Sequence, residues 1–124
     1  MLVVDTSSWV TYFKGEANLA IDEALQEGRV YLSPIVLAEL LSANLNDDRK
    51  SQLLSFLQEL PLFQTDFDHW ARVGILRRKL ASKGLNVSTP DAHIAQCSID
   101  LNARLISKDK VFAKLAKLYS SLIL

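Results

Sequence analysis

Four carboxylates stand in apolar stretches of the sequence, where a charged side chain needs a chemical reason. Asp5 directly follows an apolar run, and Glu39 is the only charged residue in the stretch 30–46. Asp91 opens the sequence Asp-Ala-His-Ile-Ala, and Asp109 comes shortly after another apolar run. If the fold brings these side chains together, their negative charges repel one another, and removing an ionised carboxylate from water is costly.

Two remedies exist for such a group of acids: some are protonated, or a cation joins them. A set of ligands made only of oxygen atoms selects a hard ion such as Mg²⁺ or Mn²⁺. Such an ion lowers the pKa of a bound water, orients it in line with the phosphorus atom and neutralises the leaving oxygen. The four acids therefore predict a Mg²⁺ or Mn²⁺ site suited to metal-assisted hydrolysis of phosphodiester bonds.

Each acid also has an explanation that involves no ligand. Asp5 precedes Thr-Ser-Ser and suits a helix cap. Asp91 suits the first turn of a helix, where a negative charge complements the helix dipole. Asp109 lies between two lysines and suits a surface turn, while Glu39 could pair with an arginine. It is the combination of four acids at matching positions that favours the metal site.

Short apolar runs that alternate with helical patterns must position these acids. The predicted strands are 2–4, 30–32, 61–63, 105–106 and 122–124. The predicted helices lie near 9–13, 17–27, 34–41, 47–60, 66–83, 89–99 and 111–118. This alternation predicts an α/β fold whose parallel strands are joined by right-handed crossovers. Ligands of such sheets bind at the carboxyl ends of the strands, which is where these acids fall.

Composition predicts one globular domain over residues 1–124. Of the residues, 49% are hydrophobic and 23% charged, as in ordinary globular proteins. The single cysteine, Cys97, excludes an internal disulfide and suits a reducing compartment. The longest uncharged apolar run, 30–38, is far shorter than the roughly 18 residues of a membrane span. With a carboxylate as early as Asp5, we expect no signal peptide, no membrane contact and a cytoplasmic location.

Charge is distributed unevenly, although 14 basic residues balance 14 acidic ones. Residues 1–62 hold four basic and nine acidic side chains, whereas residues 63–124 hold ten basic and five acidic ones. Such a split indicates either a polyanionic or acidic partner on one face, or two solvated helical surfaces that differ in charge.

The histidines and the cysteine are interpreted as structural. His93 is two residues from Asp91, so on a helix the two side chains diverge by about 200°. His69 is placed in a polar turn. Cys97 is interpreted as a small buried hydrophobic residue without a histidine at a suitable helical spacing.

Four stretches carry a family resemblance by their order and spacing: Val3–Ser7, Val36–Leu40, Thr89–Ala95 and Leu105–Asp109. Together they resemble the PIN-domain nucleases, and among these the small VapC-type toxins of type II toxin–antitoxin systems. The resemblance implies a three-layer α/β/α fold with a central parallel sheet of four or five strands. It also implies an endoribonuclease that depends on Mg²⁺ or Mn²⁺.

The resemblance also implies roles for particular residues. The acidic quartet around the metal would be Asp5, Glu39, Asp91 and Asp109. Hydroxyl groups that bind the carboxylates or the metal's waters would come from Thr6, Ser7 and Ser107. Many relatives carry a further aspartate two positions after Asp109, where this chain has Val111. One metal ion, rather than two, is therefore expected in the free protein.

The expected partners follow from the same resemblance. They are an RNA substrate, a small cognate antitoxin that covers the acidic cleft, and a second copy of the chain in a homodimer. Basic side chains that suit RNA phosphates are Arg77, Arg78, Lys79, Lys83, Lys108 and Lys110. A solvated surface explains several of these equally well.

Two other classes of function share some of these sequence features. A non-catalytic PIN-like binding module is suggested by Val111 and by the lack of an obvious general base, but retention of all four acids argues against it. A phosphatase that forms an aspartyl phosphate needs a second acid two residues after Asp5, where Ser7 stands. A phosphorelay receiver begins with paired acids, and this chain does not.

Overall fold

A parallel sheet of three strands lies at the centre of the chain. The computed structural model describes all residues, 1–124, and the strands β1 (Leu2–Val4), β2 (Val30–Tyr31) and β3 (Arg104–Ile106) pair in the order β2-β1-β3. Leu2 lies opposite Val30 on one side and opposite Arg104 on the other. All three residues of β1 are buried, as expected for a central strand covered on both faces.

The expectation of four or five strands was wrong. The segments 61–63 and 122–124 each form a single bridge, Leu32 with Leu62 at one edge and Arg104 with Ile123 at the other. Pro61 has no N–H to donate, so the first segment cannot continue a ladder of hydrogen bonds. Leu62 and Ile123 are 41% and 44% exposed, so neither edge buries enough apolar surface to extend the pairing.

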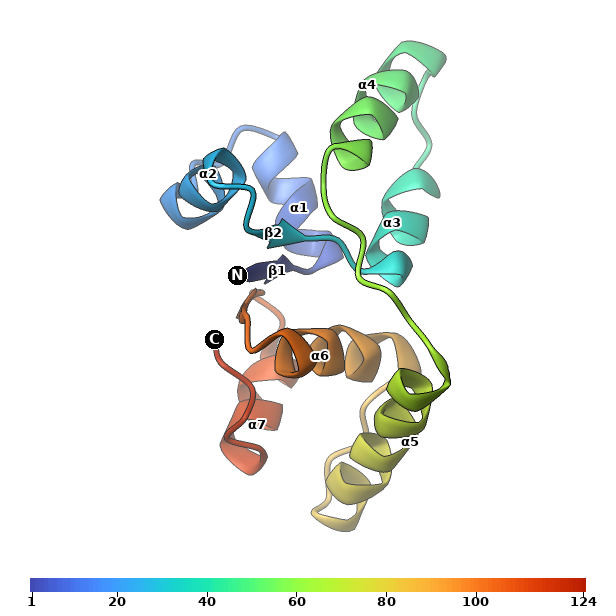
Figure 1. Cartoon of the computed structure of the whole chain (residues 1–124), viewed down its shortest axis with the longest axis vertical. Helices are drawn as coiled ribbons and strands as arrows, with labels where there is room; N and C mark the ends of the chain where they lie inside the picture. Colours follow the sequence, from blue (N-terminus) through green and yellow to red (C-terminus); the bar gives the residue numbers. More distant parts are fainter.

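Seven helices lie on both sides of the strands (Figure 1). In chain order they are α1 (Thr6–Phe13), α2 (Leu19–Gln26), α3 (Pro34–Leu41), α4 (Asp47–Gln58), α5 (Phe67–Ser82), α6 (Thr89–Leu101) and α7 (Lys110–Leu118). In Figure 1, α1, α2 and α4 lie above the strands, α3 lies to their right, and α5–α7 lie below them. The prediction of an α/β fold with a parallel sheet is confirmed.

Helix starts follow the capping pattern of the sequence. Ser33 and Ser88 cap α3 and α6, each with a proline in the first turn. Asp5 and Asp109, two of the predicted site residues, cap α1 and α7 by accepting a hydrogen bond from a backbone N–H. The same interaction that begins each of these helices therefore also fixes the position of a carboxylate.

The topology places a site between β1 and β3. The chain runs from β1 to β2 on one side and then returns to β3 on the other side of β1. Ligands of open α/β sheets bind where the strand order reverses in this way. Beyond the last residue of β1, the backbone N–H of Asp5 still donates to the carbonyl oxygen of Ile106 at 3.1 Å. Asp5 and Ser107 therefore leave the sheet side by side.

No helix combines the length and the apolar character that crossing a bilayer requires.

A carboxylate on α6 anchors the packing of α5 against α6. The Asp100 carboxyl accepts hydrogen bonds from Arg72 Nη2 at 2.9 Å, from Gln96 Nε2 at 2.9 Å and from His69 Nδ1 at 3.3 Å. Burial by itself would raise the pKa of Asp100, but these hydrogen bonds outweigh it and the pKa lies below its ordinary value.

We predict that Asp100→Asn lowers the stability of the protein in a pH-dependent way. Because the folded state lowers the pKa of Asp100, its stabilising contribution is present above the ordinary pKa of 3.8 and is lost as the pH falls through the folded-state value. Urea unfolding followed by circular dichroism should show a lower midpoint for the variant at pH 7, with the difference narrowing below about pH 4. Asp48→Asn, on exposed α4, is the control. An equal difference at pH 7 and pH 3 contradicts the prediction.

Candidate metal-binding active site

The four predicted carboxylates lie close enough to influence one another electrostatically. Asp91, in the first turn of α6, is half-buried, and burial raises the pKa of its carboxyl group above the ordinary value. The negative charges of Asp109, Glu39 and Asp5 raise that pKa further. Charges influence one another strongly in a protein only over short distances. Four different elements therefore direct their acids to the same region.

Asp5 is the most deeply placed of the four, with 5% of its surface exposed. Its Oδ1 accepts a hydrogen bond from the backbone N–H of Ser8 at 2.9 Å, and the Ser107 hydroxyl donates to its Oδ2. The Ser7 hydroxyl lies 3.3 Å from both carboxylate oxygens. These donors compensate for the removal of the carboxylate from water.

Glu39 and Asp109 lie on the solvent side of the group. The Thr6 hydroxyl donates to Glu39 Oε1 at 2.8 Å and so ties α1 to α3. Asp109 Oδ1 accepts from the backbone N–H of Val111 at 3.1 Å. The backbone N–H of Asp109 donates to the Ser107 hydroxyl at 3.0 Å, which itself donates to Asp5. All three hydroxyls named in the sequence analysis thus contact a carboxylate of the group or link two of them.

No basic side chain neutralises these acids. None of the four forms an ion pair with a lysine, an arginine or a histidine, and no hydrogen bond joins any two of them. The alternative that Glu39 pairs with an arginine is wrong, because its partner is Thr6. Asp100, outside the group, shows the usual arrangement, with Arg72 beside it. The group therefore concentrates negative charge that no side chain of the protein balances.

The donor set fits a hard divalent ion. It contains only carboxylate and hydroxyl oxygens, which are the ligands that Mg²⁺ and Mn²⁺ prefer. The hydrogen bonds to the carboxylates leave lone pairs free, because a carboxylate has about four acceptor positions. A bound cation would also offset the repulsion from neighbouring acids, which adds to the effect of burial on the pKa of Asp91.

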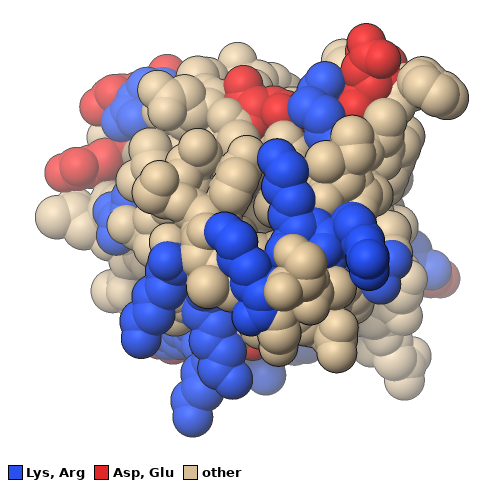
Figure 2. Space-filling model, turned by 90° about the horizontal axis from the view of Figure 1, so that it is seen from below, with Lys and Arg blue, Asp and Glu red and all other residues tan.

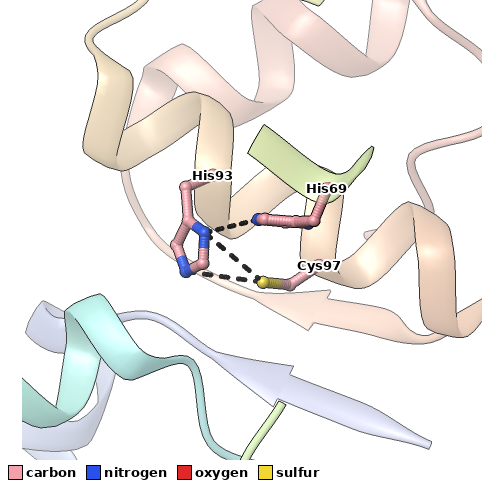
Figure 3. A group of neighbouring side chains, drawn as sticks. All are labelled: His69, His93 and Cys97. Carbon is pink, nitrogen blue, oxygen red and sulfur yellow. Dashed lines mark hydrogen bonds between the residues drawn. The ribbon is translucent and has the colours of Figure 1, made fainter. Parts of the chain in front are cut away.

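A second cluster was missed in the sequence: His69, His93 and Cys97, all buried (Figure 3). The expectation that Cys97 has no histidine at helical spacing was wrong, because His93 lies one turn before it and its Nε2 is 3.5 Å from Sγ. Nor does His69 lie in a turn, since it is part of α5 and is 1% exposed. The four-residue spacing of His93 and Cys97, with apolar neighbours, was the signal that could have revealed the cluster.

Basic side chains gather on the side of α5 and α7, seen from below in Figure 2. We define the basic face by exposed residues of these helices and of the turn after α5: Arg77, Arg78, Lys79, Lys83, Lys110, Lys114 and Lys117. Lys108, also predicted to bind phosphate, instead forms an ion pair with Glu16. The carboxylate group takes Asp5 and Glu39 from the acidic half of the chain and Asp91 and Asp109 from the basic half.

The structure combines an α/β fold with a group of acids at the carboxyl ends of the strands. Residues 2–118 match the model of the PIN domain. The chain belongs to the PIN domain family.

Comparisons with individual proteins agree with this assignment. The chain is 28% identical over 125 residues to a VapC ribonuclease of Mycobacterium bovis and to ribonuclease VapC11 of Mycobacterium tuberculosis, covering 95% of this chain and 93% of each relative. Among solved structures, VapBC2 from Rickettsia felis, bound to a DNA fragment from its promoter, is 25% identical. That match covers 99% of this chain and 96% of the other, with a TM-score of 0.77. DNA-bound VapBC from Salmonella typhimurium, 23% identical over 84% of this chain and 83% of the other, shares the fold with a TM-score of 0.70.

We predict that Asp91→Asn stabilises the metal-free protein at neutral pH. The folded state raises the pKa of Asp91, so the stability of the parent falls as the pH rises from 3.8 through the folded-state value. Asparagine keeps the shape of the side chain but carries no charge. Thermal unfolding in EDTA should therefore give a higher midpoint for the variant at pH 7, and a smaller difference near pH 4.

The matched control for this prediction is Asp48→Asn, which removes an acid from the first turn of α4, outside the group. Loss of its favourable interaction with the helix dipole should lower stability slightly. If Asp91→Asn lowers the midpoint at pH 7 as well, the carboxylates do not repel one another as described.

Proposed function

We propose that this protein is an endoribonuclease that depends on Mg²⁺ or Mn²⁺ and serves as the toxin of a toxin–antitoxin pair. The observation that carries the proposal is the group of four carboxylates, brought together from four elements without a basic partner. Membership of the PIN domain family supports it, and so does similarity to two mycobacterial proteins named as VapC ribonucleases.

We assign different roles to the buried and the exposed acids of the group. We propose that Asp5 and Asp91, the more buried pair, hold the ion, with Ser107 and Ser7 fixing the orientation of the Asp5 carboxylate. Glu39 and Asp109 lie at the solvent side, where their free oxygens can orient waters and accept a proton. When bound, the ion supplies a water of lowered pKa and neutralises the charge that develops on the leaving oxygen.

We further propose that one ion suffices in the free protein. Val111, two positions after Asp109, offers no ligand atom for a second ion, and its side chain is partly buried against the core. A second ion, if it takes part, would need the substrate phosphate as a ligand, as Mg²⁺ commonly does.

RNA would be attracted by the basic face and cleaved at the carboxylate group. The acids alone repel a polyanion, so lysines and arginines are needed to bring phosphates to them. Contacts of this kind are independent of base sequence. We therefore propose that the basic face supplies affinity for RNA and that the carboxylate group carries out its cleavage.

Two protein partners complete the proposal. The Rickettsia felis and Salmonella typhimurium structures are VapBC complexes, and we propose a small antitoxin as the corresponding partner of this chain. A homodimer is proposed from the family resemblance. A cytoplasmic location is proposed because the substrate would be cellular RNA.

We predict that RNA cleavage requires added Mn²⁺ or Mg²⁺ and stops in EDTA. Asp5→Asn and Asp91→Asn each remove a charged ligand and should lower the cleavage rate by about 100-fold or more. Asp48→Asn, an acid outside the group, should leave the rate unchanged. The readout is cleavage of labelled RNA by each variant after circular dichroism has shown that it is folded. Folded variants that cleave as fast as the parent contradict the proposal.

A calorimetric titration with Mn²⁺ distinguishes this proposal from a non-catalytic binding module. The nuclease should show saturable binding that Asp5→Asn and Asp91→Asn abolish. A degenerate module should show none.

We predict that the pair Arg78→Ala and Lys79→Ala weakens RNA binding most at low salt. Each phosphate contact on single-stranded nucleic acid contributes about 0.7 to the slope of log K against log salt, so the slope should fall by about 1.4. Filter binding in EDTA measures affinity without cleavage. The pair Arg49→Ala and Lys50→Ala, an equal loss of charge on α4, should leave the slope unchanged. Equal slopes for the two pairs contradict a role for the basic face.

A further inference from the structure

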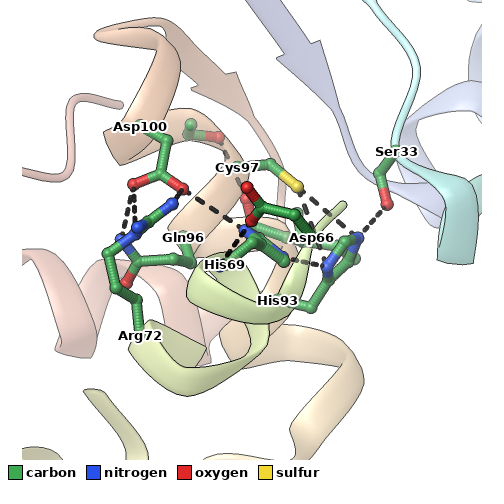
Figure 4. Close-up of polar contacts among 10 residues, drawn as sticks. Ser33, Asp66, His69, Arg72, His93, Gln96, Cys97 and Asp100 are labelled. Atoms are coloured by element: carbon green, nitrogen blue, oxygen red, sulfur yellow. Dashed lines mark hydrogen bonds and ion pairs between the residues drawn. The ribbon is translucent and has the colours of Figure 1, made fainter. Parts of the chain in front are cut away.

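A chain of hydrogen bonds links side chains of α5 and α6 to the residue that caps α3 (Figure 4). Asp100 Oδ2 lies 3.3 Å from His69 Nδ1, and His69 Nε2 lies 2.7 Å from His93 Nδ1. His93 Nε2 lies 2.6 Å from the hydroxyl oxygen of Ser33. His69, His93 and Ser33 are each 2% exposed or less. We call these four residues the buried chain.

The donors and acceptors of the buried chain can be assigned in one direction. Asp100, held ionised by Arg72, only accepts, so His69 Nδ1 must donate to it. With a single proton on its ring, His69 accepts at Nε2, and His93 Nδ1 donates to it. Neutral His93 accepts at Nε2 from the hydroxyl of Ser33. The Ser33 oxygen in turn accepts from two backbone N–H groups in the first turn of α3, so every polar group is satisfied.

A neutral His93 ring is consistent with this environment. Burial, and secondly the neighbouring His69, lowers the pKa of His93 to about 4. The indole ring of Trp70 stacks on the His93 ring, with centroids 4.9 Å apart and an interplanar angle of 16°. Phe63 packs against the His69 ring, with centroids 5.1 Å apart. His69 and His93 are thus enclosed by aromatic rings, where hydrogen bonds are strong and an unpaired polar group is costly, whereas Asp100 is the exposed end of the buried chain.

The geometry favours hydrogen bonding over a soft metal ion at His69, His93 and Cys97. One ligand atom from each of the three lies within 4.8 Å of the others. Two histidine nitrogens on a tetrahedral zinc ion, each about 2.0–2.1 Å from it, stand about 3.3 Å apart. The 2.7 Å between His69 and His93 is shorter and is a hydrogen-bond distance. Burial also raises the pKa of the Cys97 thiol, which keeps it protonated.

We propose that the buried chain is a positioning device for the metal ligands, an inference that rests on the proposed function. Ser33 caps α3, which carries Glu39, and His93 is on α6, two residues after Asp91. The Ser33–His93 bond is the only side-chain hydrogen bond that joins α3 to α6. Glu39 and Asp91 carry like charges, and this bond holds together the two helices on which they lie. His69 and Asp100 hold His93 in the orientation that the bond requires.

A double-mutant cycle on ion affinity tests this inference. Calorimetry with Mn²⁺ compares the parent with His69→Phe, Ser33→Gly and the double variant. His69→Phe keeps ring volume and leaves Asp100 paired with Arg72 and Gln96. Glycine is tolerated as a helix cap, so Ser33→Gly mainly removes the hydroxyl. Each single variant should bind Mn²⁺ about tenfold more weakly, as when a group that orients a metal ligand is removed.

The double variant should bind about as weakly as the weaker single variant, because both changes break the same chain. Ser33→Thr restores the hydroxyl and should restore affinity. Cys97→Ala is the matched control: Cys97 touches the His93 ring but is not a link in the buried chain, so affinity should stay at the parental value. Two additive losses, or an equal loss in Cys97→Ala, overturn the inference in favour of general packing.

The outcomes separate this inference from the proposed function. If the parent binds Mn²⁺ through Asp5 and Asp91 while His69→Phe and Ser33→Gly bind equally well, the positioning role is wrong and the proposed function stands. If the parent shows no saturable binding, the proposed function fails and the inference fails with it. Nitrogen NMR of the imidazoles gives a readout without metal: the protein at pH 7 should carry the ring proton of His69 and of His93 on Nδ1. A proton on Nε2 of His93 contradicts the buried chain.

Discussion

Repulsion among four carboxylates is the constraint that the rest of this fold must withstand. Asp5, Glu39, Asp91 and Asp109 lie close enough for three of them to raise the pKa of the fourth, and no basic side chain is paired with any of them. Like charges in a partly buried site disfavour the ionised state, and at Asp91 they add to the effect of burial. The fold resists through a central strand buried on both faces and through polar interactions that tie its elements together.

These interactions serve structure and function together. Asp5 and Asp109 begin helices by accepting backbone hydrogen bonds, so the geometry of each cap fixes a carboxylate within the group. Ser107 joins the two acids across the ends of β1 and β3. Holding a partly buried negative charge at Asp91 costs stability, because burial and the neighbouring acids disfavour its ionised form. This is the expected trade-off between stability and activity at a functional site.

How much could be predicted from the sequence depended on whether a feature is local. The acids at strand ends and helix starts were placed correctly, because Ser33-Pro34, Thr89-Pro90 and the apolar runs define those boundaries within a residue or two, although the cap of α6 is Ser88 rather than Thr89. The number of strands was predicted wrongly, because pairing at 61–63 and 122–124 depends on burial at the sheet edges, which local patterns do not reveal. The buried chain was also missed: His69 and His93 come from different helices, and their contact is a product of tertiary packing. The roles assigned to the four acids and three hydroxyls remain proposals.

A crystal structure of the protein grown with Mn²⁺, using the anomalous scattering of manganese, tests the central claim most directly. The account predicts one strong anomalous peak at the carboxyl ends of β1 and β3, coordinated by oxygens of Asp5 and Asp91 with Glu39 and Asp109 around it. A structure that places manganese beside His69, His93 and Cys97, or that shows no peak among the four acids at saturating Mn²⁺, would contradict it.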